Sequence, residues 1–290
     1  MADIILSEAE KIFIVHGIQD NFREDGRSCD DYRQMELETG LISNTSGSAR
    51  LRLANTEILV GIKVELEEPK PEKPDTGRLE FFVDCSANAT PEFEGRGGED
   101  LATEIMNFLS HSYSSETVLD LKSLCLVPSK LCWVFYVDVL LLECGGNLFD
   151  AASIAVKAAL FNTKIPNVSI SQESEDTELN VSDDPYDVKR IDVSRTPCII
   201  TLSKIGHCHV VDASQKEEAC CLARLMMAVT AEGNVTAMVK EGSGSLDPSS
   251  VSDMMQSGKK IGQELNYKLL EKLKEEEQKG LKRQTVGFLR

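Results

Sequence analysis

The chain has 290 residues, of which 41% are hydrophobic and 27% are charged; 48 acidic and 31 basic side chains give a net charge of −17. Enough apolar material is present to build a core, which excludes wholesale disorder, and the length fits one large domain or two smaller ones. The acidic balance excludes nucleic-acid binding by bulk charge, so any RNA contact needs a local basic patch or basic partners.

The start of the chain and its most apolar stretch indicate a soluble protein. The first eight residues, MADIILSE, lack a basic region followed by an apolar run, which predicts no secretory signal. The stretch from Cys132 to Cys144 is interrupted by Asp138 and is too short to span a bilayer, so we expect no membrane contact. Nine cysteines without a Cys-x-x-Cys pair predict reduced, mostly buried thiols.

The first half of the chain alternates between expected strands and helices. Branched and aromatic runs broken by turn signals predict a β-meander over Tyr32–Leu66 and strands over Leu79–Cys85 and Leu131–Leu142. Apolar residues at helical spacing predict a helix after the glycine-rich loop at 95–98. The alanine-rich segment Phe149–Phe161 is apolar nearly all round, which predicts a helix buried between layers.

The second half repeats this theme after an acidic stretch. Residues 171 to 192 hold eight acids and two bases, which predicts a solvated connection between two lobes. Beyond it, the pattern predicts four strands, at Pro197–Lys204, His209–Val211, Leu222–Thr230 and Val235–Lys240. It also predicts a short acidic helix at Lys216–Ala219 and a long last helix from Asp247 to about Gln278. Both lobes therefore resemble antiparallel hairpins followed by a helix, which favours an α+β architecture.

Two residue groups could in principle hold a metal. His207 and His209 flank Cys208 and share one face of an extended segment, but no further ligand lies nearby, so we predict no metal site there. Asp212 with the pair at 217 and 218 could hold a divalent cation, or could belong to the acid-rich first turn of an N-capped helix. The run after Glu218, ACCLARL, contains no acid.

The glycine pair before the alanine-rich helix could bind phosphate through backbone N–H groups. However, the residues after Gly145 and Gly146 are Asn147, Leu148, Phe149 and Asp150, which supply no positive charge. No nucleophile motif of the Gly-x-Ser-x-Gly kind is present.

Basic residues that could contact phosphates lie mostly in the first hundred positions. For each of them a solvated surface charge is the favoured interpretation. Arg96 is the strongest candidate, because the flanking glycines let a ligand approach closely, and Arg27 is the second predicted RNA-binding residue. The full set is Arg23, Arg27, Arg33, Arg50, Arg52, Lys63 and Arg96.

Several stretches together resemble the RNase PH family. They are Asp25-Gly26-Arg27, Glu94–Gly98, Trp133–Val139 leading to Gly145–Ala151, Val210–Asp212 through Glu217 and Glu218 to Asn234, and Gly242–Ser245. The resemblance implies an RNase PH-like α+β fold with two β-α-β-type lobes related by a pseudo-repeat, the first of them ribosomal protein S5 domain 2-like.

The resemblance also implies a domain organisation. It divides the chain into an N-terminal segment at 1–30, an N-terminal domain at 31–170, an acidic connection at 171–194, a C-terminal domain at 195–265 and the end of the last helix with a basic tail at 266–290.

The resemblance extends to partners and activity. It implies a ring of RNase PH-like subunits of the RNA exosome, capped by RNA-binding proteins, with RNA passing through the pore toward a separate nuclease. Active members cleave RNA with phosphate and carry Thr or Ser and then Arg after the glycine pair, where this chain has Asn147 and Leu148. They also carry acids a short way beyond the glutamate pair, where this chain has Ala219 and Arg224.

These departures lead us to expect a subunit that is not an enzyme, with no catalytic residues, no bound metal and no cofactor. It would support rRNA maturation and mRNA turnover in the nucleus, nucleolus and cytoplasm. Two alternatives stay open: an active phosphorolytic exoribonuclease that uses Asp212, Glu217 or Glu218, and an acidic adaptor that binds basic proteins through Glu173–Asp192.

Overall fold

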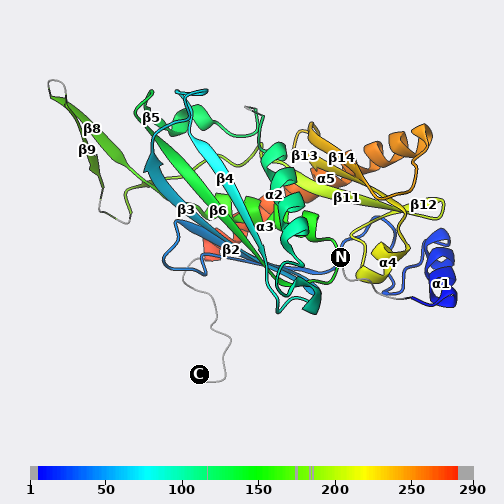
Figure 1. The fold of residues 1–290 in the computed structure, drawn as a ribbon. Helices are drawn as coiled ribbons and strands as arrows, with labels where there is room; N and C mark the ends of the chain where they lie inside the picture. The colour runs from blue at the N-terminus through cyan, green and yellow to red at the C-terminus, as the bar shows by residue number, and fades with distance from the viewer. Residues whose placement is uncertain (1–5, 116, 174–175, 183, 185, 280–290) are drawn as a thin grey trace, which may run out of the picture.

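The protein is described by a computed structural model that covers residues 6–115, 117–173, 176–182, 184 and 186–279 (Figure 1). The basic tail expected after the last helix lies outside these residues. The helices are α1 (Glu8–Gln19), α2 (Glu99–Ser112), α3 (Leu148–Asn162), α4 (Gln215–Cys220) and α5 (Pro248–Lys279), with short 3-10 turns η1 (Pro91–Phe93) and η2 (Leu121–Leu124). Among the described residues no helix has the length and apolarity needed to cross a bilayer.

The first lobe is built on a mixed sheet with strand order β1-β2-β3-β6-β4, and β5 pairs with β6 as well. Its strands are β1 (Met35–Thr39), β2 (Gly47–Leu53), β3 (Thr56–Glu67), β4 (Arg78–Cys85), β5 (Cys125–Val127) and β6 (Leu131–Glu143). The meander and the long strand expected from the sequence are confirmed. One expectation is wrong: β4 runs parallel to β6, because helix α2 carries the chain back before β6 begins.

The second lobe is a four-stranded antiparallel sheet with strand order β12-β11-β13-β14. Its strands are β11 (Cys198–Ile205), β12 (Cys208–Val211), β13 (Ala223–Val229) and β14 (Val235–Glu241). All four expected strands and the short helix are confirmed to within a few residues. Gly258 and Gly262 of α5 face Met227 and Val229 of β13, where an added Cβ atom would lie 2.0 and 2.7 Å from their side chains. The two glycines therefore let the helix lie close against this sheet.

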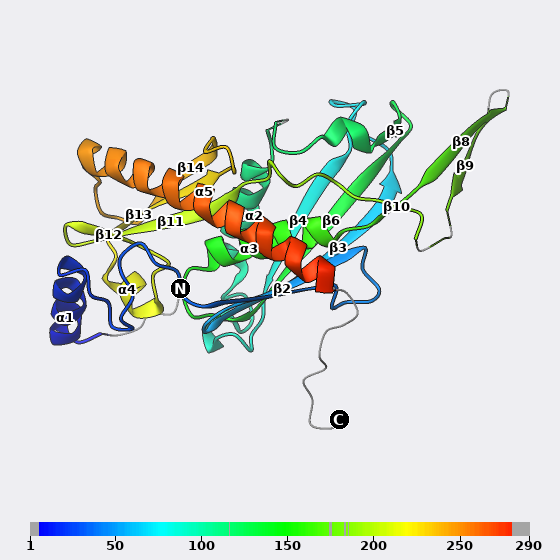
Figure 2. The same cartoon turned by 180° about the vertical axis from the view of Figure 1, so that it is seen from behind.

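Helix α3 lies between the two sheets and packs on β2, β3 and β11, as Figures 1 and 2 show. Every residue from Leu148 to Leu160 is buried, which confirms the expected helix between layers. The largest hydrophobic cluster includes Phe135 of β6, Ala155 of α3, Ile199 of β11 and Leu273 of α5. The two lobes therefore share one core, and the junction between them is fixed by packing.

Two segments contain elements that the sequence did not indicate. In the acidic stretch after α3, which was expected to be a solvated connection, β8 (Val168–Glu173) and β9 (Asp176–Val181) form an antiparallel hairpin that projects from the body (Figures 1 and 2). Short strands β7 (Ile165–Pro166) and β10 (Val188–Lys189) pair at its base. The N-terminal segment, for which no element was expected, contains α1, and a Ser7–Glu10 capping box starts it.

Candidate functional site at the junction of the lobes

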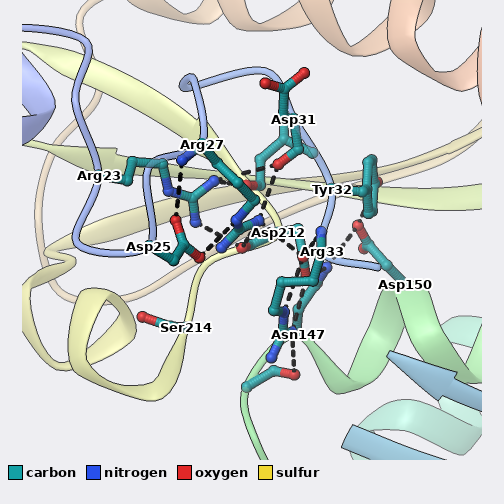
Figure 3. Close-up of polar contacts among 12 residues, drawn as sticks. Arg23, Asp25, Arg27, Asp31, Tyr32, Arg33, Asn147, Asp150, Asp212 and Ser214 are labelled. Atoms are coloured by element: carbon teal, nitrogen blue, oxygen red, sulfur yellow. Dashed lines mark hydrogen bonds and ion pairs between the residues drawn. The ribbon is translucent and has the colours of Figure 1, made fainter. Parts of the chain in front are cut away.

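Three segments that are distant in the sequence meet where the lobes join, as Figure 3 shows. They are the arginine arm at residues 23–33, the turn between β6 and α3, and the turn between β12 and α4. These segments contain the glycine pair and the acids that the sequence marked as candidate sites. Their polar side chains contact one another, and these contacts determine which of the side chains could still bind a ligand.

Asp212 lies at the centre of the junction, and its side chain is fully buried. Its carboxylate accepts hydrogen bonds from Arg33 Nε and Nη2 at 2.9 and 2.8 Å, from Arg27 Nη1 at 3.0 Å and from Asn147 Nδ2 at 2.9 Å. Burial by itself would raise the pKa of Asp212, but the hydrogen bonds and charge of Arg33 outweigh it and hold the pKa below its ordinary value. The carboxylate is therefore ionised at neutral pH and neutralised within the chain.

Glu217 is held by a second buried arginine. Arg23 Nε donates to Glu217 Oε1 at 2.8 Å, and its Nη1 and Nη2 donate to the backbone carbonyls of Val211 and Asp212 at 2.9 and 2.7 Å. Glu217 also completes a capping box with Ser214, the N-cap of α4, so the acid-rich first turn expected from the sequence is confirmed. This glutamate stabilises the start of a helix and the anchorage of the arginine arm.

The glycine turn before α3 is closed by protein groups. Gly146 has φ +94°, and a Cβ atom there would lie 2.7 Å from the carbonyl oxygen of Ala213, so only glycine fits. Arg33 donates to the carbonyls of Gly145 and Gly146 at 2.8 and 3.0 Å. The backbone N–H of Asn147 donates to Glu218 Oε1 at 2.9 Å. A carboxylate of the same chain therefore already binds the N–H of the N-cap residue, one of the groups that an anion at this helix N-terminus would use.

Burial raises the pKa of Glu218, although its hydrogen bond from the Asn147 backbone and the charge of Arg224 act in the opposite direction. The Arg224 guanidinium lies 5.4 Å from the centre of the Phe149 ring and donates to both carboxylate oxygens of Glu241 at 2.9 and 2.7 Å. Its Nη1 lies 3.8 Å from Glu218 Oε1. The region just beyond the glutamate pair thus carries a fixed cation.

Asp150 links the two lobes from the first turn of α3. Its fully buried carboxylate accepts hydrogen bonds from Tyr32 Oη and Thr201 Oγ1, both at 2.7 Å, and from Asn147 Nδ2 at 3.1 Å. Burial raises the pKa of Asp150 to about 6, because these neutral donors compensate only part of the desolvation. Asn147 donates to Asp150 and Asp212 at the same time, so it ties the glycine turn to both acids.

The two predicted RNA-binding residues lie in different environments. The side chain of Arg96 is 92% exposed before α2, with its Nε 3.7 Å from Glu99 Oε1. The side chain of Arg27 is 12% exposed and is paired with Asp25 and Asp212. RNA binding by either residue stays a prediction. The favoured interpretation of Arg23 and Arg33 as solvated surface charges is wrong, because both are buried in the junction.

The histidines and cysteines were the remaining candidate metal ligands. His209 Nε2 lies 3.3 Å from Ser257 Oγ, and within the described ranges no three His, Cys, Asp or Glu side chains are grouped so that they could hold a metal. All nine cysteines are free thiols. The expectation that most are buried is wrong, since only Cys85, Cys132 and Cys198 are buried and the other six are partly exposed.

An open hollow of about 610 Å³ lies beside the junction, lined by Arg27, Arg33, Gly145, Gln215 and Glu217 among others. The charged groups on its wall are held in ion pairs within the chain, although Arg27 Nη2 is buried without a hydrogen-bond partner. The protein thus has the two-lobed α+β architecture of the RNase PH type. It combines a mixed sheet, an antiparallel sheet with a long C-terminal helix, a buried helix between them and a glycine turn that faces an acid pair.

Comparison with known proteins identifies the family. Residues 31–166 match domain 1 of the 3′ exoribonuclease family (RNase PH), and residues 195–261 match its domain 2. The chain therefore belongs to this family, which confirms the resemblance and the fold expected from the sequence.

Relatives cover nearly the whole chain. A Dictyostelium discoideum protein named as the exosome complex exonuclease RRP42 is 35% identical over 89% of this chain and 94% of its own length. The exosome complex component Rrp42 of Thermococcus kodakarensis is 34% identical over 92% of this chain and 96% of its own length.

Solved structures agree with these relatives. A chain of the Archaeoglobus fulgidus exosome with RNA bound to the active site superposes with a TM-score of 0.76 at 26% identity, covering 90% of this chain and 98% of that one. Rice Rrp46 shares the fold with a TM-score of 0.63 at 14% identity, covering 87% of this chain and all of that one.

Proposed function

We propose that the chain is a non-catalytic ring subunit of an RNA exosome, which scaffolds the ring and helps to channel RNA for 3′–5′ processing and degradation. The relatives named Rrp42 support the ring role, because they match this chain from end to end of both lobes. The proposed partners are other RNase PH-like ring subunits, RNA-binding cap proteins and RNA in the pore.

One observation carries the non-catalytic part of the proposal. The backbone N–H at the start of α3 is hydrogen-bonded to Glu218, and the nearest guanidinium, that of Arg33, is held by Asp212 and two glycine carbonyls. A phosphate ion at this turn would have to displace a carboxylate, and the guanidinium beside the turn is already held by other groups. Because an anionic nucleophile needs such charge to bind, phosphorolysis at this turn is disfavoured.

The acids support the same proposal. Asp212 and Glu217 accept hydrogen bonds from one buried and two largely buried arginines, and a metal ion would have to compete with these fixed cations for the same oxygens. Beyond Glu218 the chain supplies Arg224 instead of further acids. Loss of the phosphate site and loss of the metal site each cost orders of magnitude in rate, so we expect no measurable chemistry.

Two experiments test the parts separately. Gentle purification of the tagged chain from cells, followed by native mass measurement, tests the ring: we expect a large particle that contains other RNase PH-like chains and cap proteins. Elution as a free chain or small homo-oligomer would refute the ring role.

The second experiment incubates the purified chain with single-stranded RNA, phosphate and Mg²⁺, with an active family member as positive control. We expect no release of nucleoside diphosphates. Phosphate-dependent release that is lost in Asp212→Ala would show instead that the chain is an active exoribonuclease.

The proposed role extends to rRNA maturation and mRNA turnover, in the nucleus, nucleolus and cytoplasm. Imaging of the tagged chain tests the location, and accumulation of 3′-extended rRNA precursors after depletion tests the process. An unchanged precursor profile would remove rRNA maturation from the proposal.

A further inference from the structure

Helix α1 is apolar on two opposite sides, although it lies at the outer end of the second lobe. Its inner side contributes Ile14 and Ile18 to a cluster with Ile205 and Val210 of the second sheet. Its outer side exposes Ile12 by 53% and Phe13 by 67%. The core explains the apolar inner side of α1, but within the described part of the chain nothing covers the apolar residues on its outer side.

Exposed apolar residues gather on α1 and directly after it. Phe13 lies one helical turn before Gly17 on the same side of α1, and the Phe22 backbone N–H donates to the Gly17 carbonyl at 2.8 Å. Phe22 is 65% exposed. Single exposed apolar residues are ordinary, but three of the eleven large ones exposed on the described chain fall within residues 12–22. We call Ile12, Phe13 and Phe22 the outer face of α1.

In both ribbon views α1 lies at the end of the molecule beside α4 and β12, and no other labelled element crosses its outer side (Figures 1 and 2). A hollow of about 250 Å³ opens next to Phe13, with Leu6, Glu10 and Glu24 among its lining residues. Lys216 also lines this hollow and pairs with Glu24 at 2.8 Å. The hollow is large enough to receive one side chain, with an apolar wall and carboxylates near its rim.

The negative charge around the outer face indicates which kind of partner could bind there. Four bases lie near this face: Arg23 is buried, the Arg27 side chain is 12% exposed, Lys11 pairs with Glu8 at 3.5 Å and Lys216 pairs with Glu24 at 2.8 Å. The exposed acids between residues 8 and 31 are seven: Glu8, Glu10, Asp20, Glu24, Asp25, Asp30 and Asp31. This charge repels the phosphates of RNA, and it also repels a second copy of the same face.

We propose that the outer face of α1 docks a neighbouring protein subunit whose contact surface has an apolar centre and a rim of arginine and lysine. An arginine or lysine side chain fits the hollow beside Phe13, because its stem packs on the apolar wall while its charge reaches Glu10. The inference rests on the proposed ring function, since it assigns one face of the chain to one ring junction.

The test measures binding of the full-length chain to each purified RNase PH-like ring subunit separately, by calorimetry, for wild type, Phe13→Ser and Phe22→Ser. We expect one partner to lose at least about 30-fold in affinity in both variants, as for a buried aromatic contact, while a second partner is unaffected. Asp20→Lys should weaken the same partner and reduce the salt dependence of its binding.

Tyr267→Ser is the matched control, because Tyr267 is 70% exposed on α5, and it should bind both partners as wild type does. Unchanged circular dichroism shows that each variant is folded. If wild type binds ring subunits and both phenylalanine variants bind them equally well, the docking inference is wrong and the ring function stands. If wild type binds none of them, the ring function itself fails. A concentration-dependent homodimer that Phe13→Ser abolishes would show that a second copy occupies the face, and would also overturn the inference.

Discussion

Replacing Asp212 by asparagine should reveal how strongly the junction depends on one carboxylate. Asp212 is fully buried and compensates the charges of Arg27 and Arg33. Without it, Arg33 loses its carboxylate partner, Arg27 keeps only Asp25, and the asparagine amide donor faces the two guanidiniums. Removing one partner of a buried ion pair typically costs 3–5 kcal/mol, so we expect a loss of about 4 kcal/mol in the free energy of unfolding. That is a large part of the roughly 5–15 kcal/mol that stabilises an ordinary domain.

Urea unfolding measures this loss, followed by the fluorescence of Trp133, the one tryptophan, and by circular dichroism. Asp25→Asn is the matched control, because Asp25 pairs with the same Arg27 but its side chain is 46% exposed. Exposed pairs are worth about 0–1 kcal/mol, so this variant should be nearly as stable as wild type. A cost below about 1 kcal/mol for Asp212→Asn would refute the reasoning.

The pH dependence gives an independent check of the same contact. The pKa of Asp212 is held below its ordinary value of 3.8 by Arg33, despite burial. A lowered pKa means that the contribution to stability is complete above the unfolded-state value and is lost as the pH falls through the folded-state value. The stability difference between wild type and Asp212→Asn should therefore be constant from pH 5 to 7 and shrink below about pH 4. A difference that grows on acidification contradicts this account.

Three further outcomes are expected. Burial raises the pKa of Asp150 from 3.8 to about 6, so wild type should lose about 3 kcal/mol of stability between pH 4 and 7, while Asp150→Asn should not. Urea unfolding of both proteins at the two pH values measures this difference, and a difference that does not change with pH would contradict the account. Gly146→Ala should cost about 1–3 kcal/mol more than Gly95→Ala, since both have positive φ but only Gly146 faces backbone atoms within 3 Å; equal thermal midpoints for the two variants contradict this. Arg96→Ala should leave the stability of the protein unchanged. It should reduce by about 1 the slope of log affinity against log salt concentration for RNA binding by the assembled ring, as expected for the loss of one phosphate contact. An unchanged slope would show that Arg96 does not contact the RNA.

Local patterns determined most of the elements. The periodicity of apolar residues predicted α2, and apolar residues nearly all round predicted α3, which the structure buries on all sides. Turn signals and branched residues predicted the strands of both sheets, because these signals depend only on residues close in sequence. Helix α1 was missed although Ser7 and Glu10 form a capping box, a signal that is readable in the sequence.

Only part of the candidate site could be predicted from local sequence patterns. The glycine pair and the acids at 212, 217 and 218 could be marked from their residue types, and the departures after Gly146 indicated a lost phosphate site. The sequence did not indicate that the side chains of Arg23 and Arg33 are withdrawn from water, since an arginine beside acidic residues normally remains solvated. Nor did it indicate that β4 is parallel to β6, because parallel pairing depends on a crossover and leaves no local pattern.

The sequence by itself thus determined most of the strands and helices, the family likeness, and the absence of a basic residue directly after the glycine turn. Only the tertiary structure decided what neutralises the acids. Arg33 and Asp212 are 179 positions apart, and Arg23 and Glu217 are 194 apart, so no spacing in the sequence relates them. They meet because the shared core around α3 fixes the two lobes against each other. Burial at that junction then turns ordinary charged residues into a closed network, because a charge without water must find its partner within the protein.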